Sequence, residues 1–171
     1  MSTLTEMQSE RNVHTFSSFV NEDVQKRADS AGIAIVLRAP GQNPKILLVH
    51  PANGSWQKAI MGIPKGKMED GEEPTDAAFR ETFEELGIQI SPEQVGKEIH
   101  TAEVWSGTKF MNNLFYLVCE IEDPSEIGLP SLVVPKAQLQ QQEVDWAGFI
   151  DLMEAYGKVP ATQRIILDRL R

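Results

Sequence analysis

Residues 66–88, GKMEDGEEPTDAAFRETFEELGI, are the feature that most constrains how this chain can fold. Gly66 and Gly71 allow tight turns of the backbone at the two ends of a short loop. Pro74 suits the first turn of a helix, and Gly87 suits the position just after the last turn. The stretch therefore predicts a loop, a helix that begins near Pro74, and a turn at Gly87.

The predicted helix has two unlike faces. Because an α-helix turns by about 100° per residue, its charged side chains and its larger apolar side chains fall on opposite sides. We expect the helix to bury Phe79, Thr82, Phe83 and Leu86 and to present Arg80, Glu81, Glu84 and Glu85 on the other side.

The acidic face needs a cation, because like charges three or four residues apart on a helix repel each other. One explanation is a solvated helix face in which Arg80 and Glu84 form an ion pair. A bound metal ion is the second explanation. The loop before the helix favours it, because a tight loop can direct backbone carbonyls toward the carboxylates. Ligands made only of oxygen suit Mg²⁺ or Mn²⁺ rather than zinc.

The stretch also resembles the signature box of the Nudix hydrolases. Gly66 is followed after five residues by Glu72, and after seven more by the run RETFEELGI of residues 80–88. Every charged and glycine position of that box is filled, whereas Thr82 stands where the family usually has an aliphatic residue. Similar features on both sides of the box extend the resemblance over about residues 31–171.

Short β-rich apolar runs surround the box. Strands on both sides of a central helix, with helices at the end, predict a mixed sheet covered on both faces. The resemblance makes this an α/β fold of the Nudix type, an α/β/α sandwich with a mixed β-sheet. Residues 123–143, with three prolines, are a candidate lid over a substrate. We expect strands over residues 31–39, 45–50, 58–66 and 144–150, a hairpin that turns at Ser106-Gly107, and helices over residues 151–158 and 160–171.

The resemblance implies roles for the acidic residues of the box. Glu84 and Glu85 would be metal ligands, and Glu81 would be a further ligand or the base that activates water. Backbone carbonyls near Lys65 and Gly66 would complete the coordination of Mg²⁺ or Mn²⁺.

Other charged residues would support this site. Arg80 would hold the carboxylates by ion pairing, and Glu72 would brace the loop. Members of the family often add an acidic ligand from a late loop, for which Glu143 is the best-placed residue. Glu120 and Glu122 are alternatives, and an exposed carboxylate without a ligand role is the other explanation for Glu143.

Lysines and tryptophans outside the acidic face are candidates for binding a substrate. Lys65, Lys67 and Lys109 are candidate phosphate contacts. Trp56 and Trp105 are candidates for stacking on a base, although Trp56 could instead cover the apolar core.

Carboxylates that hold divalent cations beside a phosphate chain favour attack of water on phosphorus. The resemblance implies hydrolysis of a diphosphate linkage in a nucleoside diphosphate-linked substrate, foremost a nucleoside triphosphate or a dinucleoside polyphosphate. ADP-ribose, a nucleotide sugar and 5′-triphosphorylated RNA are alternative substrates. A catalytically silent module that senses a nucleotide is the alternative from another functional class.

Composition narrows the partners and the compartment. A net charge of −9 in 171 residues argues against binding of duplex nucleic acid or of an anionic membrane. The single Cys119 suits a reducing compartment, and no apolar run is as long as a membrane span, so we expect a cytoplasmic protein. We expect a polar arm over residues 1–30 and one domain over residues 31–171, as a monomer or a homodimer.

Overall fold

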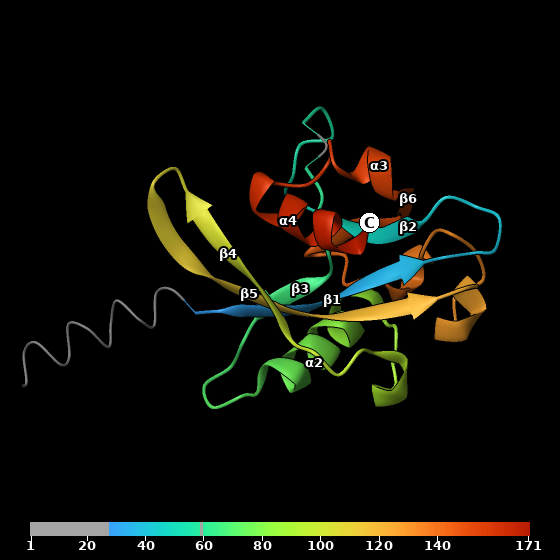
Figure 1. The fold of residues 1–171 in the computed structure, drawn as a ribbon, viewed down its shortest axis with the longest axis horizontal. Helices are drawn as coiled ribbons and strands as arrows, with labels where there is room; N and C mark the ends of the chain where they lie inside the picture. Colours follow the sequence, from blue (N-terminus) through green and yellow to red (C-terminus); the bar gives the residue numbers. More distant parts are fainter. Residues whose placement is uncertain (1–27, 59) are drawn as a thin grey trace, which may run out of the picture.

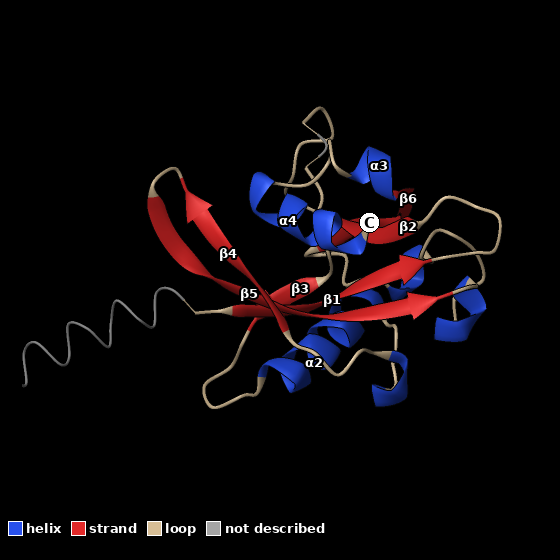
Figure 2. Cartoon of the chain, viewed as in Figure 1, coloured by secondary structure: helices blue, strands red, loops and turns tan. Residues whose placement is uncertain are grey.

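The structure is a computed structural model that describes residues 28–58 and 60–171. Within these residues, six strands form one mixed sheet, and helices cover both of its faces (Figures 1 and 2). The predicted arm lies outside the described residues up to residue 27, and its last residue, Ser30, already begins the first strand. None of the described helices is both long and apolar enough to cross a membrane.

The elements follow the order expected from the sequence. The strands are β1 (Ser30–Leu37), β2 (Lys45–Pro51), β3 (Lys65–Lys67), β4 (His100–Ser106), β5 (Lys109–Ile121) and β6 (Val144–Asp151). The α-helices are α2 (Pro74–Leu86), α3 (Leu152–Ala155) and α4 (Ala161–Leu170). Short 3₁₀ helices are η1 (Pro92–Gln94), η2 (Pro124–Ile127) and η3 (Lys136–Gln138).

Strand β1 lies at the centre of the sheet, whose order is β4-β5-β1-β2-β6. It pairs in parallel with β5 along its whole length, from Ser30 opposite Leu114 to Leu37 opposite Ile121. On its other side, β1 pairs with β3 at its beginning and with β2 only at its end. The short strand β3 is therefore held at the middle of the molecule, where the chain then runs into α2 (Figure 1).

The sheet separates two apolar cores, because successive side chains of a strand point to opposite faces. Ile33 and Ile35 of β1 pack in the core on the α2 side, whereas Ala34 and Val36 pack in the core that includes α3 and α4. Every residue of β1 is buried, as expected for a strand covered on both faces. The predicted three-layer arrangement with a mixed sheet is confirmed.

The predicted helix of the box is confirmed at both ends. Pro74 occupies the first turn of α2, where the missing N–H costs no hydrogen bond. Gly87 ends the helix with a left-handed φ of 64°, and its N–H donates to the carbonyl of Phe83. The predicted hairpin is also present, since β4 and β5 are antiparallel and Gly107 in the turn has a φ of 62°.

The strand expected over residues 58–66 is largely wrong. Only its last residues belong to β3, and Gly62 forms an isolated bridge with Val49. The reason is that neighbouring backbone donors leave the sheet: Met61 donates to the carbonyl of Lys158, and Ile63 donates to the side chain of Gln163.

The segment over residues 123–143 is not the free lid that its prolines suggested. It contains η2 and η3, and the N–H of Val134 donates to the carbonyl of Ala147 in β6. Four of its apolar side chains are buried in the core on the α2 side, which fixes the segment against the sheet: Ile127, Leu129, Val134 and Leu139.

Candidate active site

Helix α2 turns part of its acidic face toward the interior. Glu81 and Glu85 are buried, with 9% and 7% of their surface exposed, whereas Phe83, which we expected in the core, is 56% exposed. Thr82 and Leu86 are buried as expected. The predicted burial of Phe83 is therefore wrong. The side of α2 that faces the sheet instead includes the glutamates that approach β3.

A glycine makes the approach of β3 and α2 possible. A Cβ atom on Gly66 would lie 2.0 Å from Oε2 of Glu81 and 2.5 Å from its Oε1. Gly66 is also fixed in the sheet, because it pairs with Ala31 of β1. Any side chain at Gly66 would push the Glu81 carboxylate out of its position.

Arg80 connects the acidic residues of the box. Its Nε and one terminal nitrogen donate to the two carboxylate oxygens of Glu72, at 2.8 and 2.9 Å. Its other terminal nitrogen donates to Glu81 at 2.8 Å and to Glu84 at 3.1 Å. The guanidinium also donates to the carbonyl of Lys67, so it ties the end of β3 and the loop to α2.

Glu72 lies where a residue that braces the loop is expected. Besides its paired bonds to Arg80, its carboxylate accepts a hydrogen bond from the N–H of Glu69. The Arg80 guanidinium, followed by this backbone bond, lowers the pKa of Glu72 to about 2. Glu72 is consequently ionised throughout the neutral range and remains ion-paired with Arg80.

Glu85 is the carboxylate with unmet bonding capacity. Its Oε2 atom is buried and has no hydrogen-bond partner among the described residues. Burial raises the pKa of Glu85 to about 8, and the nearby charges of Glu81 and Glu143 act in the same direction, against Lys65. Burial also raises the pKa of Glu81 above its ordinary value.

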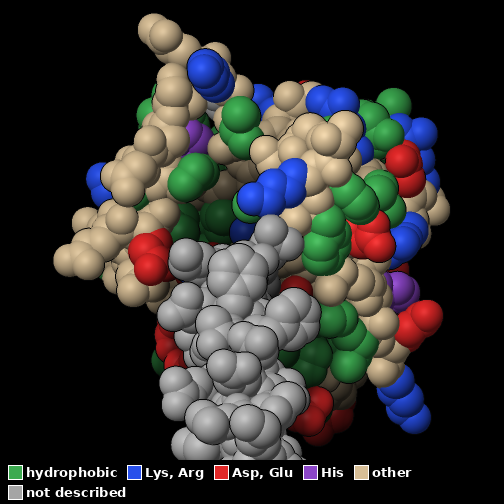
Figure 3. All heavy atoms as spheres, turned by 90° about the vertical axis from the view of Figure 1, so that its left-hand side faces the viewer, with side chains coloured by type: hydrophobic (Ala, Val, Ile, Leu, Met, Phe, Trp, Pro, Cys, Tyr) green, Lys and Arg blue, Asp and Glu red, His purple; other side chains and the backbone are tan. Residues whose placement is uncertain are grey.

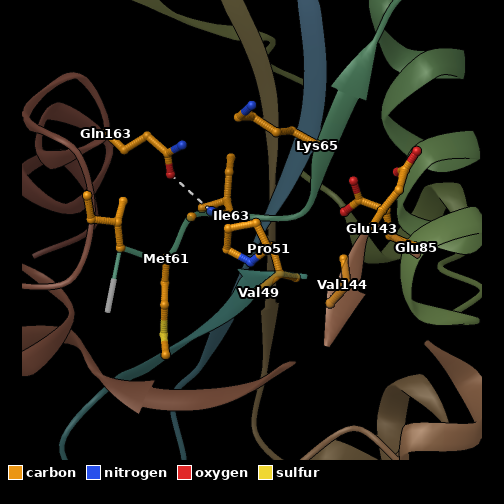
Figure 4. A pocket seen from close by; sticks show the side chains of 11 residues that line it. Val49, Pro51, Met61, Ile63, Lys65, Glu85, Glu143, Val144 and Gln163 are labelled. Atoms are coloured by element: carbon orange, nitrogen blue, oxygen red, sulfur yellow. Dashed lines mark hydrogen bonds between the residues drawn. The ribbon is translucent and has the colours of Figure 1, made fainter. Parts of the chain in front are cut away.

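Glu85 and Glu143 lie side by side at one wall of a pocket of about 250 Å³ (Figure 4). Glu143 immediately precedes β6, and the pocket places it with Glu85 and Lys65. Glu120 and Glu122, the alternatives to Glu143, lie away from this wall. Glu120 pairs with Val36 near the end of β1 that is far from β3, and Glu122 lies two residues further along the chain. The remaining lining residues are Val49, Pro51, Ile60, Met61, Gly62, Ile63, Val144 and Gln163.

The donor set fits a hard divalent cation, as judged from the unpartnered oxygen of Glu85 and the charges of Glu81 and Glu143 beside it. Within residues 28–58 and 60–171, no three acidic, histidine or cysteine side chains are already arranged around a common metal position. Part of the reason that these carboxylates do not converge is that Arg80 donates hydrogen bonds to Glu81 and Glu84. Ligand roles for these residues and for Gly66 stay predictions.

The predicted substrate-binding residues fall into two groups. Lys65 lines the pocket, whereas Lys67, the last residue of β3, is exposed and is not one of the lining residues. Trp105 and Lys109 lie instead on the β4–β5 hairpin, outside the lining of the pocket. Figure 3 shows the side of the molecule that carries the hairpin, where hydrophobic side chains gather in a hollow with basic side chains near its rim.

Trp56 covers a buried side chain, whereas its expected stacking on a base stays a prediction. Its ring stacks on the ring of His50, with centroids 3.8 Å apart and planes at 11°, yet the residue remains 54% exposed. His50 is fully buried, and its Nδ1 lies 2.7 Å from Oδ1 of Asp145. Trp56 therefore covers a buried histidine on one side and stays accessible to solvent.

Two features of this region were not predicted from the sequence. Neither the His50–Asp145 pair nor the buried Gln163 belongs to a motif, and the partners are 95 and 100 positions apart along the chain. The only signal was a polar residue close to an apolar run, with His50 at the end of KILLVH and Gln163 two residues before IIL, and a structural role explains this equally well.

Comparison with known proteins places this fold in a family. The family model of the NUDIX domain matches residues 26–170. A Mycobacterium tuberculosis protein named "Putative 8-oxo-dGTP diphosphatase 3" is 35% identical over 78 residues, which are 46% of this chain and 36% of that protein. The match thus spans little more than a third of the length of this curated relative.

Solved structures share the fold at lower identity. The Caenorhabditis elegans Ap4A hydrolase, in a binary complex, has a TM-score of 0.58 at 23% identity, covering 84% of this chain and 94% of that chain. The NUDIX domain of Shewanella oneidensis NrtR complexed with ADP ribose has a TM-score of 0.57 at 13% identity, covering 85% and 89%. With a family match over residues 26–170, a filled signature box and this shared fold, the chain belongs to the Nudix family.

Proposed function

We propose that this chain is a Nudix pyrophosphohydrolase that uses Mg²⁺ or Mn²⁺ to cleave a diphosphate linkage in a nucleoside diphosphate-linked substrate. The observation that carries the proposal is the buried, unpartnered oxygen of Glu85 at the wall of a pocket that also includes Glu143 and Lys65. A carboxylate in that state is poorly satisfied by the protein alone, and a divalent cation would satisfy it.

Glutamates from two elements would hold the metal. Glu84 and Glu85 on α2 and Glu143 before β6 would be ligands. Glu81 would be a further ligand or the acceptor of a proton from the attacking water. Either role could use its Oε2 and leave the hydrogen bond from Arg80 to Oε1 in place. Mg²⁺ or Mn²⁺ at these carboxylates would neutralise phosphate oxygens and make a water molecule more acidic.

The other residues of the site would position the reacting groups. Arg80 fixes Glu81 and Glu84 relative to the loop, so that their carboxylates keep their orientation during turnover. Lys65 supplies a positive charge beside the acidic wall, where a phosphate chain would lie. The apolar side chains of the pocket would limit the access of bulk water to the substrate.

A nucleoside triphosphate or a dinucleoside polyphosphate is the proposed substrate. The names of the mycobacterial relative and of the nematode Ap4A hydrolase support these two classes. The ADP-ribose complex of the Shewanella domain keeps ADP-ribose among the compounds to test. The acidic character of the whole chain agrees with a small nucleotide whose charge is neutralised locally by a metal.

A turnover panel tests this proposal. Purified protein with Mg²⁺ or Mn²⁺ is expected to hydrolyse at least one nucleotide among nucleoside triphosphates, diadenosine polyphosphates, ADP-ribose, nucleotide sugars and 5′-triphosphorylated RNA. Glu85→Gln keeps the side-chain shape and is expected to lower turnover by about 100-fold or more, since it removes a ligand charge rather than an outer support.

Glu122→Gln is the matched control, because Glu122 lies beyond β5 at the other end of the sheet and should leave turnover unchanged. Full activity of Glu85→Gln would contradict the assignment of the site. Tight nucleotide binding without hydrolysis of any compound under either metal would favour the nucleotide-sensing alternative.

A further inference from the structure

Gln163 is a buried polar residue in the wall of the pocket, on the opposite side from the carboxylates (Figure 4). It belongs to α4 and has only 5% of its surface exposed. Its Oε1 accepts a hydrogen bond of 3.0 Å from the N–H of Ile63. This contact connects the last helix to the chain segment that leads into β3.

The bond to Ile63 determines which way the amide of Gln163 faces. A backbone N–H can only donate, so it must meet the oxygen of the amide, and the nitrogen must take the other position. Among the described residues, Nε2 of Gln163 has no hydrogen-bond partner, and Figure 4 shows it directed into the pocket. Gly62 leaves room for it, since a Cβ there would lie 2.9 Å from Nε2.

The pocket suits one planar ring system. Its volume of about 250 Å³ is below the roughly 300–1,000 Å³ that is typical of sites for drug-sized ligands. Apolar side chains form most of its wall, among them Val49, Met61 and Val144. A nucleobase could enter here while the attached phosphates reach the carboxylates on the other side.

We propose that Gln163 selects nucleotides whose base presents a carbonyl oxygen, through a hydrogen bond donated by its fixed Nε2. This inference rests on the proposed function, because it deepens the substrate class of the same site. A donor with a fixed orientation favours the keto group of guanine, hypoxanthine or uracil. It disfavours the amino group of adenine or cytosine, which would set donor against donor.

Matched nucleotides isolate this contact. ITP and ATP carry a carbonyl and an amino group respectively at position 6 of the purine, and UTP and CTP differ similarly at position 4 of the pyrimidine. For the wild type, kcat/KM is expected to be about tenfold or more higher for the keto member of each pair than for the amino member. Calorimetric affinities for the monophosphates IMP and AMP should show the same preference without any turnover.

Two substitutions of Gln163 separate recognition from folding. Gln163→Met removes the donor at similar volume and should reduce the preference to within about threefold. Gln163→Glu keeps an acceptor for the N–H of Ile63, so the local fold is retained. Where its buried carboxyl is ionised, its second oxygen accepts rather than donates, so the preference for keto bases should weaken as the pH rises.

Gln94 provides the matched control, because its Oε1 also accepts a backbone N–H, that of Ser91, far from the pocket. Gln94→Glu should leave both base ratios unchanged. If the wild type has no keto preference, or if Gln163→Met lowers the values for both members of each pair equally, the inference is overturned. If no nucleotide is hydrolysed but the affinities still follow Gln163, only the proposed activity is wrong.

Discussion

At the scale of single residues, Arg80 shows why the charges of the box are compatible with one another. Its guanidinium makes five hydrogen bonds, to Glu72 twice, to Glu81, to Glu84 and to the carbonyl of Lys67. A guanidinium has five N–H donors in a rigid planar arrangement, so Arg80 uses its whole donor capacity here. Four of these bonds go to carboxylates, which holds the acidic side chains apart.

Arg80→Lys should therefore disturb the site although the charge is kept. A lysine is a point charge with three donors and cannot hold Glu72 in a paired contact while reaching two other carboxylates. The affinity for Mn²⁺ is expected to fall by about 10- to 100-fold, as for other residues that orient metal ligands. Calorimetric titration with Mn²⁺ measures this, with Arg164→Lys on α4 as the control. Equal affinities would show that Arg80 does not orient the ligands.

Glu85 should make the stability of the metal-free protein depend on pH. Its pKa rises from 4.5 to about 8 on folding, so the folded state holds this proton more tightly. The resulting stability is complete below about pH 4.5 and is lost as the pH rises toward 8, by at most about 1.4 kcal/mol per pH unit.

Urea unfolding in EDTA between pH 5 and pH 8 tests this expectation. The wild type should lose on the order of a few kcal/mol of unfolding free energy across this range. Glu85→Gln, which cannot ionise, should lose much less and should be the more stable protein at pH 8. Glu72 does not interfere, because its pKa of about 2 places its own titration below this range. Parallel curves for the two proteins would contradict the burial of an ionisable Glu85.

Single residues also show how far the sequence could lead. The spacing of the box placed Glu81 and Glu85 on one helix, and the position before the last strand pointed to Glu143, which does lie beside Glu85. Phe83 was placed wrongly, because helical periodicity gives the angle between side chains but not which arc meets the sheet. Gln163 could not be assigned, since its role depends on a backbone N–H 100 positions away.

At the scale of elements, the contact between β3 and α2 depends on Gly66. Gly66→Ala would bring a Cβ to within 2.0 Å of the Glu81 carboxylate, which must then move. We expect kcat/KM to fall by about 100-fold, since displacement of a reacting group by about 1 Å has this effect. The fold should remain, because the alanine Cβ can be accommodated if the flexible end of Glu81 turns away.

Gly71→Ala is the matched control and should behave in the opposite way. Gly71 has a left-handed φ of 74°, but a Cβ there would have no atom within 4 Å. The substitution should cost about 1–2 kcal/mol of unfolding free energy through backbone strain and leave turnover nearly unchanged. Steady-state kinetics and urea unfolding of both variants provide the comparison. A larger loss of turnover in Gly71→Ala would show that loop conformation matters more than the contact with Glu81.

Elements with local signals were predicted well from the sequence. Pro74 and Gly87 mark the ends of α2, and the glycine at the turn marks the β4–β5 hairpin. The strand over residues 58–66 was overestimated, because apolar composition does not reveal that Met61 and Ile63 donate hydrogen bonds outside the sheet. Likewise, prolines in residues 123–143 indicated irregular backbone correctly but said nothing about the burial of Leu129 or Val134.

At the scale of the whole molecule, the arrangement of the sheet decides which residues meet. The central pairing joins β1 in parallel to β5, although more than seventy residues separate them along the chain. Periodicity within one strand cannot specify such a partner, so the sequence predicted a covered mixed sheet, whereas the strand order came only with the structure. That order is also what brings Glu143, immediately before β6, next to Glu85 of α2.

Because the proposed metal joins α2 to the start of β6, its binding should stabilise the entire domain. A ligand that binds only the folded state at 100 times its Kd adds about 2.7 kcal/mol to the unfolding free energy. For a chain of this size, that corresponds to a rise in Tm of roughly 5–10 °C. Thermal unfolding at pH 8 with saturating Mn²⁺ should show this rise for the wild type and for Glu122→Gln, whereas Glu85→Gln or Glu143→Gln should lose most of it. An equal rise in all four proteins would place the ion elsewhere, because the charge that joins the two elements would then be unnecessary.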